Sequence, residues 1–294
     1  MSHEEFTDRL KTRRFLLAAV IAAILIWVWA FWPRQPVLTI TFLDVHQGDC
    51  AVIRTPSGKT VLIDAGGAGN YDVGSRVVAP FLRRNGIRTL DLVVMTHPHQ
   101  DHIGGMYGVL KNVNARAVLD SGAPHASESY ERTLRLIKQK SIRYRLARRG
   151  QKISFPDGVK IDVLHPGDEE MPDLNNRSVV LRMTYGSASF LFTGDAEHEA
   201  EDDMLKNCGR VRSTVLKVGH HGSAQATTEP WLKAVKPSIA VISVGRSNQF
   251  GHPAFETLQR LTDSSARILR TDRDGAVTIT TDGKRLHVTT TRRP

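Results

Sequence analysis

The sequence predicts one mixed α/β domain behind an apolar N-terminal segment. Two observations carry this prediction. Short apolar runs, typical of buried strands, alternate with longer amphipathic stretches through two successive parts of the chain. No low-complexity linker interrupts residues 37–294, which are numerous enough to bury one large core. We therefore expect an N-terminal segment over residues 1–36 and a single folded domain over residues 37–294.

The first part of the domain opens with strands and continues with helices. The strands are apolar runs bounded by turn-forming residues such as Pro, Ser and Gly. The first helix is followed by Gly86, a residue type that commonly ends helices. The predicted strands are 38–45, 50–54, 61–64 and 92–95, and the predicted helices are 73–84 and 128–140.

The second part repeats this plan. Gly186 and Ser187 separate two apolar runs, which predicts a β-hairpin. A further helix is expected to begin near Pro253. Periodicity alone indicates the mixed α/β class and no order of layers. The predicted strands are 159–164, 178–185, 188–193, 215–218 and 239–244, and the predicted helix is 197–206.

The N-terminal segment has the features of a membrane anchor. Residues 15–32 form an uncharged run of 18 residues, at the lower limit for a bilayer-spanning helix. Trp27, Trp29 and Trp32 lie at its end, where interfacial aromatic residues are common, and basic residues precede it. We expect an uncleaved signal anchor, with a cytoplasmic tail and the folded domain outside the cytoplasm. A cleaved signal peptide is the alternative, but small cleavage-site residues are lacking there.

The densest cluster of metal-binding side chains directly follows the predicted strand 92–95. Three imidazoles and one carboxylate fall within six residues. Imidazole nitrogen and carboxylate oxygen suit Zn, Mn or Fe(II), and alternate residues of a loop can converge on one point. Loops at strand ends commonly carry function. We therefore predict a metal site at His97, His99, Asp101 and His102.

Two later strands also end in such side chains. Asp195 follows strand 188–193, and His220 and His221 follow strand 215–218. Alone, the first would indicate a turn and the second a solvated loop. Together with the first cluster they supply imidazoles for two ions and a carboxylate able to bridge them. The sequence thus predicts two divalent metal ions, with Zn and Mn both open.

These motifs resemble those of the metallo-β-lactamase superfamily. Residues 97–102 match its HxHxDH signature, Asp64 its first motif, Asp195 its bridging aspartate, and the pair at 220–221 its last ligand. The resemblance covers roughly residues 38–283. Four segments resemble, more specifically, the extracytoplasmic hydrolase domain of ComEC-type DNA-uptake (competence) proteins. These segments are residues 42–49, 175–181, 217–223 and 248–253.

The resemblance implies a four-layer αββα sandwich and a set of metal ligands. Between His220 and His221 we expect His220 to bind, because adjacent residues of an extended segment point to opposite sides and His220 is nearer the strand end. Asp64 would brace a ligating imidazole. In the implied set, His97 and His99 hold one ion, Asp101, His102 and His220 or His221 hold the other, Asp195 bridges them, and Asp101 also orients the attacking water.

The third ligand of the first ion departs from the family pattern. Many superfamily members carry another His before the bridging aspartate, where this chain has Asn175 and Ser178. We expect Asn175 as a weaker ligand. His165 is the alternative, although a His at the end of an apolar strand is more often a packed residue.

Two residues of the segment 248–253 are candidates for contact with substrate. The imidazole of His252 titrates near neutrality, so it suits proton donation to a leaving group or contact with a phosphate oxygen. Asn248 is a candidate substrate-binding residue in the same segment. For both, the alternative is a structural role, as a cap of the helix that begins near Pro253.

Charge favours a polyanionic substrate. The net charge is +10, and residues 1–36 hold five basic and three acidic side chains, so the folded domain keeps +8. Residues 132–152 contain nine basic residues and no acidic one. Phosphate contacts of this kind give sequence-independent affinity for DNA, although a charge run is often only a solvated helix face. The candidate phosphate contacts are Arg143, Arg145, Arg148 and Arg149.

Together these features predict a metal-dependent phosphodiesterase or nuclease, ComEC-like, that acts on DNA outside the cytoplasm. The alternatives are hydrolysis of another small ester, such as a phosphoester head group or a lactone, and an anchored DNA-binding module with a vestigial metal site. ComEC-type proteins have many membrane spans and this sequence has one candidate. We therefore expect a membrane channel or uptake protein, not yet identified, as its partner.

Overall fold

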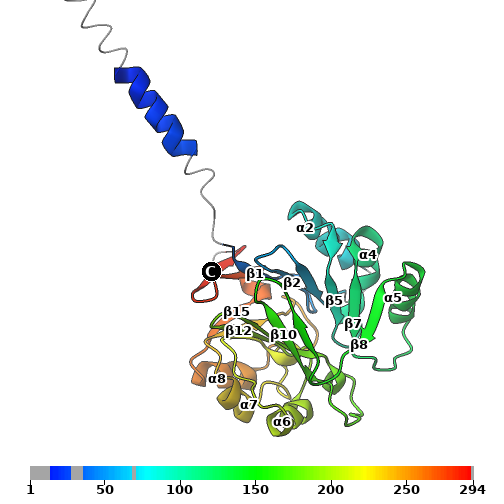
Figure 1. Ribbon diagram of the computed structural model, residues 1–294. Coiled ribbons are helices and arrows are strands. Elements are labelled where there is room, and N and C mark those ends of the chain that lie inside the picture. The colour runs from blue at the N-terminus through cyan, green and yellow to red at the C-terminus, as the bar shows by residue number, and fades with distance from the viewer. Residues whose placement is uncertain (1–13, 28–35, 68–70, 293–294) are drawn as a thin grey trace, which may run out of the picture. The chain divides into compact units, whose positions relative to one another are not determined.

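The computed structural model describes residues 14–27, 36–67 and 71–292. The chain divides into two units, Met1–Pro36 and Val37–Pro294. Residues 14–27 of the first unit are helical (Figure 1). Within the described ranges, no helix combines the length and the apolar character that crossing a bilayer requires. The end of the predicted anchor, with Trp29 and Trp32, lies outside the described residues.

Two large β-sheets form the centre of the second unit. A third, small sheet pairs β4 (Thr89–Leu90) with β6 (Asn114–Ala115). The eight-stranded sheet has the order β17 (Leu286–Thr290), β16 (Val277–Thr281), β1 (Leu38–Phe42), β2 (Ala51–Arg54), β3 (Thr60–Ile63), β5 (Leu92–Met95), β7 (Ala117–Asp120) and β8 (Arg143–Leu146). The seven-stranded sheet has the order β15 (Arg267–Arg270), β14 (Ile239–Ile242), β13 (Val215–Lys217), β12 (Ala188–Phe192), β11 (Val180–Tyr185), β10 (Lys160–His165) and β9 (Lys152–Ser154).

Each sheet joins an antiparallel part to a parallel part. In the eight-stranded sheet β3, β5, β7 and β8 run parallel. In the seven-stranded sheet β12, β13, β14 and β15 do so. Parallel strands of one sheet end at the same edge, and ligand sites of α/β proteins commonly lie beyond that edge. The ends of β5, β12 and β13 are therefore the natural places for a functional site.

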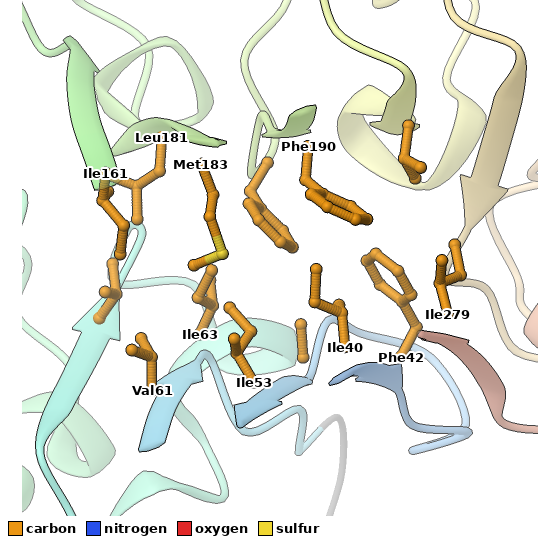
Figure 2. Packing of buried hydrophobic residues seen from close by; sticks show 14 of the residues in the cluster. Ile40, Phe42, Ile53, Val61, Ile63, Ile161, Leu181, Met183, Phe190 and Ile279 are labelled. Carbon is orange, nitrogen blue, oxygen red and sulfur yellow. The ribbon is translucent and has the colours of Figure 1, made fainter. Parts of the chain in front are cut away.

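The two sheets pack face to face through a dry core. Phe42 and Phe190 meet between them together with Ile40, Ile63 and Met183, all at most 4% exposed (Figure 2). These side chains alternate with outward-facing ones along their strands, as burial of one sheet face requires. Burial of such apolar surface is the main favourable contribution to folding.

Helices cover the outer face of each sheet (Figure 1). Two sheets and one layer of helices on the outer face of each make four layers, with an apolar cluster beneath each helical layer, and the expected α/β sandwich is confirmed. On the eight-stranded sheet lie the π-helical turn η1 (Gly74–Val78), α2 (Ala79–Arg84), α4 (Met106–Asn112) and α5 (Glu128–Gln139); on the other lie α6 (His198–Asn207), α7 (Glu229–Val235) and α8 (Phe255–Asp263). The remaining turns are α3 (Gln100–Ile103), η2 (Asn175–Arg177), η3 (Gly219–Gly222) and α9 (Thr271–Asp274).

The basic stretch 132–152 differs from a continuous solvated helix face. It runs from the middle of α5 through β8, a strand at the edge of the eight-stranded sheet, and through the loop 147–151 to the first residue of β9. Arginine is suitable there because an edge strand with charged side chains resists pairing with other chains.

The predicted strand 38–45 is also shorter, since β1 ends at Phe42 and the following residues form the loop that reaches the functional site.

Candidate metal centre

The centre is built at the ends of three buried strands. β5 continues into Thr96 and His97, and the one-turn helix α3 then presents Asp101 and His102. β12 continues into Asp195, and β13 into the turn η3. Gly194, with φ of 54°, gives the turn after β12 its shape, and a Cβ atom there would lie 2.9 Å from Ser178. The strand ends therefore bring together side chains that are far apart in the sequence.

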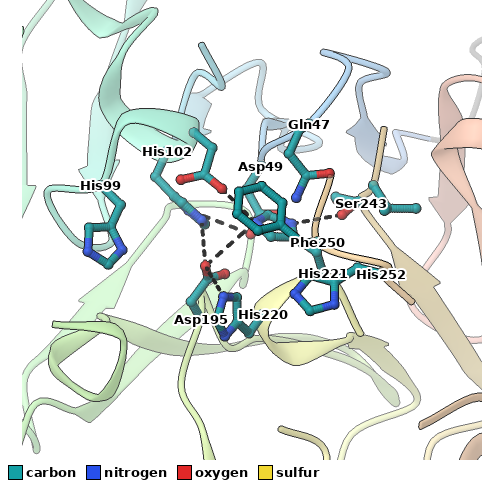
Figure 3. A network of polar contacts seen from close by, with 12 residues as sticks. Gln47, Asp49, His99, His102, Asp195, His220, His221, Ser243, Phe250 and His252 are labelled. Atoms are coloured by element: carbon teal, nitrogen blue, oxygen red, sulfur yellow. Dashed lines mark hydrogen bonds and ion pairs between the residues drawn. The ribbon is translucent and has the colours of Figure 1, made fainter. Parts of the chain in front are cut away.

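Four side chains form a compact ligand group. Asp101, His102, Asp195 and His221 each offer a ligand atom, and these atoms lie within 4.8 Å of one another. His102 Nε2 is 3.0 Å from Asp195 Oδ2, and His221 Nε2 is 3.1 Å from Asp101 Oδ2 (Figure 3). Imidazole and carboxylate donors in this arrangement are typical of divalent metal sites.

A second pair of imidazoles, His97 and His99, lies next to the compact group, since the rings of His97 and His102 are 4.1 Å apart. His97 Nε2 is 3.8 Å from Asp195 Oδ2 and 3.1 Å from His99 Nδ1. The same oxygen is 3.5 Å from His221 Nε2. Asp195 Oδ2 thus lies within 3.8 Å of His97, His102 and His221, and its role as a bridging carboxylate stays a prediction.

Unpaired buried atoms indicate that these residues fit metal ions. Among the described residues, six buried side-chain nitrogen or oxygen atoms have no hydrogen-bond partner, and Trp231 contributes one of them. The other five surround this centre. Three of them still lie near an oppositely charged group, His102 Nε2 at 3.0 Å, Asp49 Oδ1 at 3.4 Å and Asp195 Oδ1 at 3.7 Å. Gln47 Nε2 and Asn175 Oδ1 have neither a hydrogen bond nor an ion pair. A buried polar atom without a partner is costly, so such a concentration calls for a ligand. The five atoms are Gln47 Nε2, Asp49 Oδ1, His102 Nε2, Asn175 Oδ1 and Asp195 Oδ1.

The electrostatics of the centre also favour cations. Burial opposes a charge on His221, but the carboxylates of Asp195, Asp101 and Asp49 raise its pKa to about 10. Burial likewise opposes ionisation of Asp195, yet the charges of His102 and His221 hold its pKa well below the usual value. Carboxylates that draw protons onto neighbouring imidazoles would draw divalent cations in their place, with release of those protons.

Asp64 braces His102 as expected. Its Oδ2 lies 2.7 Å from His102 Nδ1 and accepts a hydrogen bond of 2.6 Å from Thr96 Oγ1. The Thr96 backbone N–H donates to Oδ1 at 2.8 Å. Asp64 is fully buried, so these contacts fix the imidazole with Nε2 directed at the centre.

The structure favours His221 over His220, which corrects the preference drawn from the sequence. His221 Nδ1 is 2.8 Å from Ser243 O, so its Nε2 faces the ligand group. His220 Nδ1 instead contacts Glu197 Oε1 at 2.7 Å, and its Nε2 is 3.8 Å from Asp195. Both residues have positive φ, 43° and 52°. Because the segment is coiled and not extended, the alternation of a strand does not apply there.

Two buried residues of the centre were missed by the sequence analysis. The Lys217 ammonium pairs with Asp49 Oδ2, donates to Gly194 O at 2.8 Å and lies 3.7 Å from Asp195 Oδ1. Asp49 Oδ1 lies 3.4 Å from His221 Nδ1. Both belong to segments that carry the family resemblance, 42–49 and 217–223, which was the only signal for them. Their chemistry gives no local clue, because an Asp and a Lys are ordinary surface residues.

A pocket of about 320 Å³ opens onto the centre. His252 lies in it, half-buried, with its ring 5.4 Å from the His220 ring and stacked on Phe250 at 5.9 Å. Burial and the nearby charges of His220 and His221 lower the pKa of His252. The pocket is lined by Gln47, His99, Gln100, Asp101, Asn175, Asp195, His220, His221, Phe250 and His252.

Asn248 does not line this pocket, and its side chain forms hydrogen bonds within its own loop. Its Nδ2 donates to Gly245 O at 3.0 Å and to His252 O at 2.7 Å, while its Oδ1 accepts from the backbone of Phe250 and His252. These bonds use the donors and acceptors of the amide. Asn248 therefore positions His252, in place of the predicted contact with substrate. Neither residue caps α8, whose N-cap is Ala254.

Asn175 and His165 have different surroundings. Asn175 Oδ1 is unpaired and the residue lines the pocket. His165 contacts Asp203 at 3.2 Å and Asn176 O at 2.8 Å, away from the ligand group. Ser178 Oγ lies 3.3 Å from His97 Nδ1 and orients that ring. Of the two candidates for a third ligand, the geometry favours Asn175.

The four arginines divide into two pairs. Arg143 and Arg145 are exposed on β8. Arg148 donates to Ser121 O at 3.2 Å and to Ala147 O at 2.6 Å. Arg149 pairs with Asp203 and donates to Leu164 O at 3.1 Å. Arg149 thus ties the chain after β8 to β10 and α6, whereas Arg148 is exposed and bonds to the segment after β7 through one nitrogen; their contact with phosphate stays a prediction.

Solved structures share this fold. The metallo-beta-lactamase fold protein YhfI from Bacillus subtilis superposes with a TM-score of 0.53 at 12% identity, over 84% of this chain and 100% of that one. A metallo hydrolase from the archaeon Ignicoccus hospitalis gives a TM-score of 0.52 at 17% identity, over 82% of this chain and 98% of that one. At these identities the likeness concerns the fold alone.

Sequence comparison identifies closer relatives. ComE operon protein 3 of Bacillus subtilis is 32% identical over 251 residues, 81% of this chain and 32% of the relative. Competence protein ComA of Neisseria gonorrhoeae is 33% identical over 239 residues, 81% of this chain and 31% of the relative. The chain spans about a third of the length of these relatives. The profile of the Metallo-beta-lactamase superfamily matches residues 43–246, so the chain belongs to that superfamily and resembles its competence-protein members.

Proposed function

We propose that this protein is a metal-dependent phosphodiesterase, and more specifically a nuclease that acts on DNA outside the cytoplasm. One observation carries the hydrolytic part of the proposal: Asp101, His102, Asp195 and His221 form a compact ligand group, the imidazoles of His97 and His99 lie next to it, and buried atoms without hydrogen-bond partners surround it. The names of the competence relatives support DNA as the substrate. The net charge of +10 supports a polyanion as well.

Each side chain has a distinct task in the proposed site. When bound, two divalent cations lower the pKa of water from 15.7 to roughly 7 and offset the charge of a phosphodiester. Asp101 accepts a hydrogen bond from a water at the pocket floor and so orients it. His252, whose pKa is lowered, is neutral at pH 7 and offers a ring N–H to a phosphoryl or leaving oxygen. In this proposal, Asp101, His102 and His221 hold one ion, His97, His99 and Asn175 hold the other, and Asp195 contacts both.

The donors leave two metals as candidates. The proposed ligand atoms are imidazole nitrogens, carboxylate oxygens and one amide oxygen, with no thiolate. Such sets suit Zn and Mn. We propose one of these two as the native metal.

The N-terminal segment supports a location at the membrane. We propose that residues 15–32 anchor the chain, with the basic residues before them in the cytoplasm and the hydrolase domain outside. About two thirds of each competence relative lies outside the match. We therefore propose a membrane-embedded uptake channel as the partner. A reporter fused after Pro294 should be active only outside the cytoplasm, and activity inside would overturn this orientation.

The decisive experiment measures hydrolysis and bound metal together. The protein, loaded with Mn, Zn or Mg, is assayed on DNA, on bis(p-nitrophenyl) phosphate, and on a lactone. Cleavage of DNA supports the nuclease; cleavage of the lactone alone would replace it with a small-ester hydrolase, and binding of DNA without any cleavage would indicate a vestigial site. Asp195→Ala should reduce metal content, measured by elemental analysis, more than His97→Ala. Full metal content in Asp195→Ala would remove the bridging assignment.

A further inference from the structure

The amide of Gln47 is held in one orientation beside the metal centre. Gln47 lies in the loop after β1 and is 8% exposed. Its Oε1 accepts a hydrogen bond of 3.1 Å from the buried backbone N–H of Gly245. Its Nε2 is buried and has no hydrogen-bond partner. Figure 3 draws this nitrogen on the side of the amide that faces the centre.

The hydrogen bond from Gly245 prevents the amide from turning over. The exchange of Oε1 and Nε2 would place an NH₂ group against the N–H of Gly245, and two donors cannot bond each other. The loops also pack closely, because a Cβ atom at Gly245 would lie 2.8 Å from Gln47 N. The donor is therefore fixed in place before any ligand arrives, as preorganised catalytic donors are.

The surroundings of Nε2 define what it can bind. Gln47 lines the pocket together with Asp101, His221 and His252. The carboxylate of Asp101 already contacts His221 at 3.1 Å, and the structure gives Gln47 no bond to it. A donor without a partner requires an acceptor from the ligand. Because the proposed centre binds cations, a negatively charged oxygen is the favoured acceptor.

We propose that Gln47 Nε2 donates a hydrogen bond to an anionic phosphoryl oxygen of the substrate. This assignment rests on the proposed function for the identity of the substrate as a phosphodiester. Gln47 then belongs to the residues that touch the reacting group, beside the metal ligands. It also explains why Gly245 and Gln47, 198 positions apart, are joined by a buried hydrogen bond: that bond aims the donor.

The test uses two substitutions of similar size. Gln47→Glu keeps an oxygen for the Gly245 N–H and replaces the donor with an acceptor. Gln47→Met removes the donor without adding charge. Gln259→Glu, on the exposed face of α8, is the matched control for the added charge. The full chain, loaded with metal, is titrated with inorganic phosphate by calorimetry, assayed on bis(p-nitrophenyl) phosphate, and analysed for metal content.

We expect both Gln47 variants to retain their metal and to bind phosphate on the order of tenfold more weakly than the parent, as loss of a hydrogen bond to a charged group implies. The value of kcat should fall on the order of 10²-fold. Gln259→Glu should match the parent. Unchanged phosphate affinity in Gln47→Met, or a loss that follows lost metal, would overturn the assignment. If the parent binds phosphate through Gln47 but hydrolyses no phosphodiester, the proposed function fails and the anion-binding role stands.

Discussion

At the scale of single residues, backbone conformation decides which of two adjacent imidazoles reaches the centre. His220 and His221 both have positive φ, which is uncommon for residues with a side chain. The turn directs His221 toward Asp195, whereas His220 contacts Glu197. The His220 side chain is 24% exposed. The strained turn is maintained by contacts around it, including the bond between His221 and Ser243 O.

The first prediction follows from this turn. His221→Ala should reduce metal content by about one ion per chain, because it removes a member of the compact ligand group. His220→Ala should retain more metal, since His220 lies outside the compact ligand group and its Nδ1 contacts Glu197 Oε1 at 2.7 Å. Elemental analysis after gel filtration measures both. Equal loss of metal in the two variants would return His220 to the ligand set.

These residues also define what sequence can predict about the site. His97, His99, Asp101 and His102 lie in one short motif after a buried strand, so their proximity follows from local sequence. The choice of His221 depends on two dihedral angles that no residue type specifies. Asp49 and Lys217 are paired only because β1 and β13, in different sheets, end at the same edge. Proximity of that kind is a property of the assembled fold.

At the scale of elements, a buried carboxylate joins two outer helices. Glu201 of α6 accepts hydrogen bonds from the Thr227 N–H at 2.6 Å, the Thr228 N–H at 3.0 Å and the Thr228 hydroxyl at 2.7 Å. Thr228 is the N-cap of α7, and its side chain also accepts from the N–H of Trp231. Burial raises the pKa of Glu201 to about 7, against the opposing effect of these hydrogen bonds.

The second prediction concerns the pH dependence of stability. The pKa of Glu201 in the folded state, about 7, exceeds the ordinary value of 4.5. Its favourable contribution to the free energy of unfolding is therefore complete below pH 4.5 and is lost as pH rises through 7. Relative to Glu201→Gln, which stays neutral, the free energy of unfolding of the parent should fall by about 2 kcal/mol between pH 5 and pH 8. Urea denaturation of both proteins gives this difference. Glu256→Gln, on the exposed side of α8, is the control and should give none.

Elements differ in how well sequence predicts them. Strands such as β5 and β12 are continuous apolar runs because both of their faces are covered, and they were predicted within a residue or two of their ends. The hairpin at Gly186 is confirmed, with φ of 56°. β8 was not predicted, since Arg143-Tyr144-Arg145-Leu146 is exposed on every residue and has no buried face to give it a pattern. Only pairing with β7 makes it a strand.

At the scale of the whole molecule, exposed arginines lie on β8, which is separated by β7 from the strand that carries the metal motif. β8 runs parallel to β7, and the chain after β7 leads to His125, whose ring is 6.0 Å from that of His99. Arg143 and Arg145 therefore sit on a strand whose neighbour continues to the edge of the site. A polyanion bound there could extend from the metal pocket along the sheet edge.

The third prediction tests this path. Arg143→Gln combined with Arg145→Gln should weaken DNA binding for all sequences and reduce the slope of log affinity against log salt by up to about 0.9 per lost contact on duplex, or 0.7 on single strands. Hydrolysis of bis(p-nitrophenyl) phosphate should not change, because the ligands are untouched. The double substitution Arg83→Gln and Arg84→Gln, with the same loss of charge on α2, is the control. Fluorescence anisotropy at several salt concentrations measures the slope; an unchanged slope would make the β8 arginines a solvated edge.

The fourth prediction concerns removal of metal. Asp101 and His221, which are 120 positions apart, come from the two different sheets. An unfolded chain cannot keep such ligands together, so binding favours the folded state, by about 1.4 kcal/mol for each tenfold excess of free metal over the dissociation constant. A chelator should therefore lower the melting temperature of the parent much more than that of Asp195→Ala. Identical shifts would mean that the bridging carboxylate contributes nothing to metal binding.

The position of the centre between the sheets has a further consequence for folding order. Neither half of the domain holds a complete ligand set, because the motif at 97–102 follows β5 whereas Asp195 and His221 follow β12 and β13. A ribosome-bound chain that has released only its first half would carry the motif at 97–102 and Asp64 but would lack Asp195 and His221. We therefore expect complete metal binding to follow folding of both halves, and a bound ion would then link the two halves of the domain reversibly.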